Sequence, residues 1–186
     1  MSGKTILLAA LLYAAPIFCQ QSPWSDPRSV DGQFEWIHLL ASESEIRLQL
    51  GQPSMIGDFD GYRSWQYRIG EELDHDDFSH ALVFRRSDGK LVSLSRTYTE
   101  PRLADAWFPH DQTVVHTLHA SGQLDFQMRV RRLPAGTLLL APGSGEWGKP
   151  VQQLVLIHES VLARFYPELA EQMQRPDRVT QSESLR

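Results

Sequence analysis

The chain of 186 residues is predicted to adopt an α+β fold, in which one or two antiparallel sheets pack against short helices. Three observations support this prediction: runs of alternating apolar and polar residues, a strong hairpin turn, and a short segment with signals for both helix ends. In residues 64–69, Trp65 and Tyr67 share one face while Gln66 lies on the other, as in a half-buried strand. The runs 81–85 and 91–98 flank an Asp-Gly pair, a favoured hairpin sequence.

The first residues are expected to be a cleavable signal peptide, here assigned to residues 1–20. Lys4 precedes an apolar run over residues 6–15, which has the length of a signal core and is too short to span a membrane. Cys19 is the only cysteine, and lipid attachment there remains an alternative. Residues 21–33 are polar and are expected to form a flexible leader.

The first helix is predicted over residues 43–50. Ser42 and Glu45 have the spacing of a capping box, in which each side chain bonds the backbone amide of the other residue. Gly51 suits a helix end, and Pro53 prevents the helix from continuing.

The remaining strands and helices are predicted from the same kinds of signal, and the C-terminal tail is polar. A helix is expected after Ser160, and residues 174–186 are expected to be disordered. One domain over residues 34–173 is predicted, with possible sub-halves at 34–100 and 101–173. Further strands are expected at residues 113–118, 125–133, 137–141 and 153–157.

Composition narrows the classes of partner. The formal net charge of −5 argues against nucleic acid and against anionic membrane surfaces as main partners. After the signal core no second long apolar run occurs, so no integral membrane segment is expected after cleavage.

The segment from Ser42 to Pro53, followed by Trp65 and Tyr67, resembles the small outer-membrane lipoproteins of the SmpA/OmlA type. The resemblance covers about residues 39–98. It implies a short helical pair leading into a three-stranded antiparallel sheet, and an accessory role in the assembly of β-barrel proteins. The related β-lactamase-inhibitor-protein fold repeats such a unit in tandem. By analogy, this resemblance implies protein–protein contact rather than chemistry.

No catalytic motif is recognised, and no cofactor is expected. The candidate metal ligands are His75, Asp77 and His80, because residues 74–80 concentrate imidazoles and carboxylates that suit a divalent ion. The alternative is a solvated acidic loop that precedes a strand.

Aromatic residues are the stronger candidates for binding. Trp107, Phe108 and Trp147 fall in expected loops, and such side chains often anchor partner interfaces. The sequence therefore predicts an exported, non-enzymatic protein of the cell envelope or secreted space that binds another protein. The alternative is a small extracytoplasmic metal-binding protein or enzyme that uses the 74–80 loop.

Overall fold

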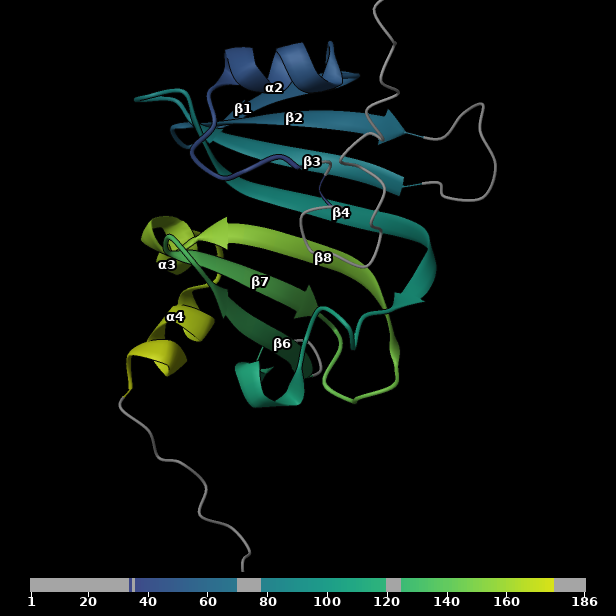
Figure 1. Cartoon of the computed structure of the whole chain (residues 1–186). Coiled ribbons are helices and arrows are strands. Elements are labelled where there is room, and N and C mark those ends of the chain that lie inside the picture. The colour runs from purple at the N-terminus through teal and green to yellow at the C-terminus, as the bar shows by residue number, and fades with distance from the viewer. Residues whose placement is uncertain (1–33, 35, 70–77, 120–124, 176–186) are drawn as a thin grey trace, which may run out of the picture.

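The computed structural model describes residues 34, 36–69, 78–119 and 125–175 (Figure 1). The expected signal peptide, the leader and nearly all of the expected tail lie outside these residues. The described strands are β1 (Met55–Phe59), β2 (Tyr62–Ile69), β3 (Phe78–Arg85), β4 (Lys90–Leu103), β5 (Thr113–Leu118), β6 (Phe126–Leu133), β7 (Thr137–Pro142) and β8 (Pro150–His158). The described helices are α2 (Glu43–Leu50), α3 (Leu162–Phe165) and α4 (Pro167–Gln174), with single 3-10 turns η2 (His110–Gln112) and η3 (Glu159–Val161).

All eight strands belong to one antiparallel sheet with the order β1-β2-β3-β4-β8-β7-β6-β5. Each half of the sheet is a four-stranded meander, and the last strand of one meander pairs with the last strand of the other. The shared pairing of β4 with β8 places Leu94 opposite Leu156 in the middle of the sheet. The two edges of the sheet are therefore β1 and β5.

The predicted α+β class is wrong, because the molecule is dominated by this single sheet and its helices are few and short. Two strand assignments contributed to the error. β1 was not predicted, because Gly57 and Asp58 interrupt its apolar pattern. β4 continues past Pro101 to Leu103. Pro101 has no backbone N–H, and the irregular pairing with β8 between Thr97 and Arg102 accommodates it.

Helix α2 has the ends that the sequence predicts. The Ser42 amide donates to the Glu45 carboxylate at 2.6 Å, and the Glu45 amide donates to the Ser42 hydroxyl at 3.3 Å. Gly51 ends the helix with a φ of 78°, a left-handed conformation that favours glycine. The helix buries Ile46 against the first half of the sheet (Figure 1).

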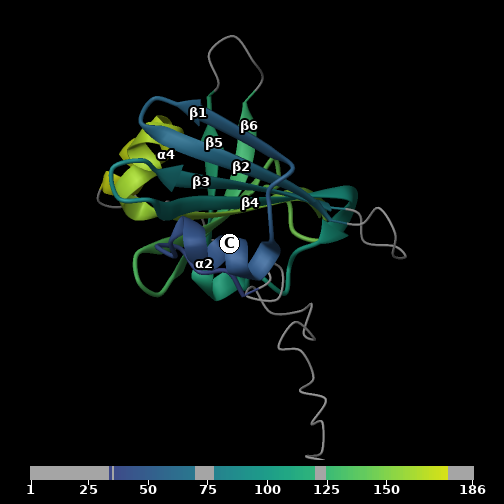
Figure 2. The same cartoon turned by 90° about the horizontal axis from the view of Figure 1, so that it is seen from above.

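Both faces of the sheet carry apolar clusters. The first cluster lies under α2 and under residues 36–41, here called the strap, and it includes Trp65, Phe84 and Phe108. The second lies under α3 and α4 and includes Met128 and Leu169. In the view from above, α2 and α4 lie apart from each other on different sides of the strands (Figure 2). Alternation along β7 sends Leu138 to one cluster and Leu139 to the other, which explains its nearly continuous apolar run.

Within the described residues, no helix combines the length and the apolar character that a membrane crossing requires.

Candidate binding sites

The candidate metal ligands are only partly visible. His75 and Asp77 lie outside the described residues. His80 lies in β3, where its side chain is fully buried and its ring centroid is 6.4 Å from that of Phe34. Across the residues that the structure describes, no three His, Cys, Asp or Glu side chains are grouped in a way that could hold a metal ion.

The candidate contact residues fall into two groups. Trp107 and Phe108 are buried in the first apolar cluster, and the Trp107 ring stacks on Tyr98 with centroids 6.4 Å apart. Trp147 is half-buried, and its ring lies over the guanidinium of Arg129. The distance from Cζ of Arg129 to the centroid of the Trp147 ring is 4.6 Å. Of these aromatic residues, only Trp147 presents part of its surface to solvent, whereas Trp107 and Phe108 pack the interior.

Edge strand β1 is the most exposed apolar element of the described chain. The side chains of Met55, Ile56 and Phe59 are 59%, 51% and 43% exposed. β1 also contains no lysine or proline, which commonly protect sheet edges. Its one charged residue, Asp58, accepts a hydrogen bond from Arg63 at 3.0 Å.

The turn after β1 fixes which backbone groups are free. Asp60 and Gly61 both have positive φ and connect Phe59 directly to Tyr62, as in a two-residue type I′ turn. In such a hairpin the flanking pair is hydrogen-bonded, and bonded pairs then alternate along the strand. The backbone N–H and C=O groups of Ile56 and Asp58 therefore point to the outer edge.

The opposite edge strand, β5, is partly covered. In α4, the Gln172 amide donates to the Thr117 carbonyl at 2.8 Å, and Glu168 accepts from the His119 amide at 2.8 Å. These contacts occupy backbone groups at the end of β5, so α4 shields part of that edge. At β1 the contact with a helix is weaker: Phe165 of α3 meets the ring of Phe59, with centroids 6.5 Å apart.

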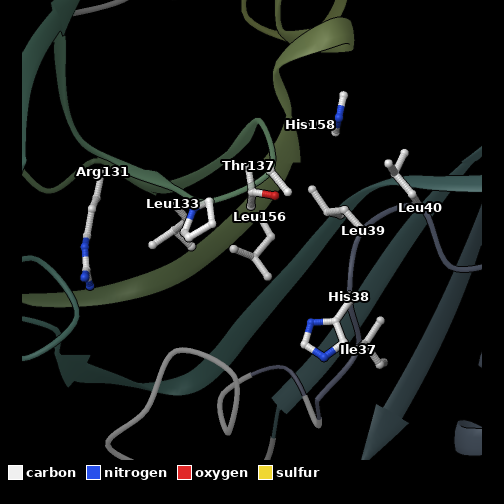
Figure 3. Close-up of a pocket in the computed structure, with 11 residues that line it drawn as sticks. Ile37, His38, Leu39, Leu40, Arg131, Leu133, Thr137, Leu156 and His158 are labelled. Atoms are coloured by element: carbon white, nitrogen blue, oxygen red, sulfur yellow. The ribbon is translucent and has the colours of Figure 1, made fainter.

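A cavity of about 440 Å³, here called the strap cavity, lies between the strap and the turn that joins β6 to β7 (Figure 3). Its size falls within the range of small-molecule sites. Leucine side chains occupy its centre, while His158, His38 and Arg131 lie around them (Figure 3). The cavity is lined by Ile37, His38, Leu39, Leu40, Arg131, Leu133, Pro134, Ala135, Thr137, Leu156 and His158.

The arginine and histidine side chains of the strap cavity supply hydrogen-bond donors. Arg131 donates through Nη1 to the Trp107 carbonyl at 2.9 Å, while its buried Nε has no hydrogen-bond partner among the described residues. Nδ1 of His158 accepts from the Ser160 amide at 3.2 Å, so the proton of the neutral ring lies on Nε2. The lining contains no Asp or Glu.

The strap itself holds two residues in a costly backbone conformation. Trp36 and Leu40 have φ values of 58° and 69°, which L-amino acids with bulky side chains rarely adopt. The Leu40 amide donates to the Leu91 carbonyl at 2.7 Å, and the Leu91 amide donates to the Ala41 carbonyl at 2.9 Å. These bonds fix the strap to β4, so that one wall of the cavity is held in place by the sheet.

The described residues define a sheet-dominated protein with an open edge strand and with a cavity that is lined by leucine and by cationic or imidazole groups. Comparison with known proteins does not narrow this class further, because no family model, no curated protein and no solved structure matches the chain.

Sequence reasoning missed both of these sites. The strap cavity combines residues more than a hundred positions apart, such as Leu39 and Leu156, which only the folded sheet brings together. The β1 edge had one available signal, the Asp60-Gly61 turn, which indicates a hairpin whose first strand must be residues 55–59.

Proposed function

We propose that this chain is an exported, non-enzymatic protein that binds another protein by adding a strand of that partner to β1. The observation that carries the proposal is the combination of free backbone groups at Ile56 and Asp58 with the exposed side chains of Met55, Ile56 and Phe59. In strand addition, backbone hydrogen bonds supply affinity and alternate side chains supply selectivity. The partner is therefore an extended segment with apolar residues at alternate positions.

Two physical arguments support β1 over the aromatic residues as the contact surface. Trp107 and Phe108 contribute to the interior, so a partner could reach them only after local unfolding. An exposed apolar strand edge, in contrast, tends to pair with another chain unless it is protected. The half-buried Trp147 is retained as a secondary contact.

Export rests on the N-terminal segment, where Lys4 precedes the apolar run of residues 6–15. Mass spectrometry of the protein from its native source tests this part of the proposal. We expect a soluble extracytoplasmic species that begins at about residue 20 or 21. A soluble cytosolic species that retains Met1 would contradict export.

Binding through β1 is tested by affinity capture from extracytoplasmic extracts with matched variants of the chain. Ile56→Pro removes a backbone N–H that points away from β2, and Ile56→Lys adds a charge at the same place. Leu48→Lys is the control, because Leu48 is 89% exposed on α2. A Trp147→Ala variant tests the secondary contact.

We expect a protein partner that the unmodified chain and Leu48→Lys retain and that both Ile56 variants lose. Circular dichroism and thermal melting must show that the Ile56 variants remain folded. Equal capture by all variants would exclude β1 as the binding edge. Concentration-dependent self-association that is lost in the Ile56 variants would instead make a second copy of this chain the partner.

A further inference from the structure

We propose that the strap cavity binds a small amphipathic anion, with an apolar body among its leucines and an anionic group toward Arg131. This site is separate from the β1 edge and does not depend on the function proposed for that edge.

The charge of the ligand follows from the donors in the lining. Arg131 carries a permanent positive charge, and its buried Nε has no hydrogen-bond partner among the described residues. An anionic oxygen in the cavity that reaches the guanidinium of Arg131 would form a strong charge-assisted hydrogen bond. Because the lining supplies no carboxylate to neutralise Arg131, an anion is favoured over a cation.

The apolar character of the ligand follows from the position of the leucines. Leu39, Leu133 and Leu156 lie between Arg131 on one side and His158 on the other (Figure 3). A fully hydrated anion such as phosphate would leave these side chains without contacts. A ligand with an apolar chain covers them while its head group reaches the guanidinium.

His158 gives the cavity a second polar end. Its Nδ1 is held by Ser160, so its Nε2–H is the donor that remains. A Cβ at Gly136 would lie 3.5 Å from this Nε2, which places the donor next to the turn that walls the cavity. We assign the anionic group of the ligand to Arg131 and not to His158, because the arginine side chain is charged at every physiological pH.

The test is isothermal titration calorimetry of the purified chain with three probes. Decanoate has both the apolar chain and the carboxylate, butyrate has the same head group with a short chain, and decyltrimethylammonium has the same chain with a positive head group. All are used below their micellar concentrations. We expect saturable binding of decanoate, much weaker binding of butyrate, and no binding of the cation.

Adjacent arginines on β6 provide matched variants. Arg131→Gln removes the charge in the cavity and should weaken decanoate binding about tenfold. Arg132→Gln removes an arginine that pairs with Glu159 outside the cavity lining and should leave binding unchanged.

A second pair of variants keeps the test valid if Arg131→Gln folds poorly. Leu39→Asp places a negative charge in the cavity wall and should abolish decanoate binding, whereas Leu48→Asp on the exposed face of α2 should not. The proposal would be overturned if decanoate fails to bind saturably, if the cation binds as well as decanoate, or if Leu39→Asp binds decanoate as the unmodified chain does.

Discussion

The guanidinium of Arg129 lies fully buried beneath the ring of Trp147, 4.6 Å from the ring centroid. It donates to the Asp105 carboxylate at 2.7 Å and to the Glu146 carbonyl. Asp105 also accepts from the Gly148 amide at 2.9 Å. A single strand residue therefore fixes the loop after β4 and the loop between β7 and β8.

Replacing Arg129 should destabilise the whole fold. We expect Arg129→Ala to lower the free energy of unfolding by about 3 kcal/mol, because it leaves a cavity in the buried space beneath Trp147 and removes the hydrogen bonds of the guanidinium to Asp105 and Glu146. Urea denaturation measures this change. Arg132→Ala is the control and should cost about 0.5 kcal/mol or less, because its pair with Glu159 is exposed. Similar losses in both variants would show that burial of Arg129 contributes little.

The turn between β6 and β7 holds a correctable strain at Ala135. Ala135 has a φ of 57° and Gly136 a φ of 67°, the conformation of a type I′ turn, in which Asn-Gly is favoured. We expect Ala135→Asn to raise the free energy of unfolding by about 0.5 kcal/mol, and Ala135→Val to lower it by about 1 kcal/mol. Thermal melting compares the two. A more stable Val variant would contradict the left-handed conformation at this position.

The capping box of α2 predicts a moderate effect. Ser42→Ala removes the acceptor for the Glu45 amide and should lower the free energy of unfolding by about 1 kcal/mol. Leu48→Ala, at an exposed position of the same helix, should change it by less than about 0.5 kcal/mol. Chemical denaturation of both variants checks this difference, and a neutral Ser42→Ala would indicate that packing of Ile46 alone holds the helix.

The pair of His119 and Asp125 predicts a pH-dependent contribution. A hydrogen bond and charge attraction from Asp125 raise the pKa of His119 above its ordinary value of 6.5. The protonated form is therefore favoured in the folded state, and its contribution to stability is complete below pH 6.5. That contribution is lost as the pH rises through the raised pKa of folded His119.

We expect His119→Gln to be less stable than the unmodified chain at about pH 5 and equally stable at about pH 9, once the imidazole is neutral. Thermal melting at both pH values measures the difference. Asp125→Asn should reproduce the loss at low pH. A His119→Gln effect that is the same at both pH values would show that the ion pair does not contribute.

Local signals in the sequence accounted for much of the secondary structure. The capping box, the Asp88-Gly89 turn and the alternation around Trp65 all predict elements that the structure contains. They failed at β1, where Gly57 interrupts the apolar pattern, and at β4, which continues past the expected run of residues 91–98 to Leu103. In both cases pairing with a neighbouring strand outweighs the local preference of a single residue.

The candidate sites were harder to predict, because the burial of a side chain also depends on residues that are distant in the sequence. Trp107 and Trp147 are both aromatic residues in expected loops, yet the first is buried and the second is partly exposed. Arg129 and Arg131 reach these two loops from β6 and hold them through hydrogen bonds.

The sequence by itself determined the short-range features, because caps, turns and strand alternation depend on residues a few positions apart. Only the tertiary structure decided that β4 pairs with β8, that β1 is an open edge, and that Leu39 meets Leu156 in the strap cavity. These relationships join distant segments, and their stability comes from burying two faces of one sheet at the same time, a condition that no local pattern specifies.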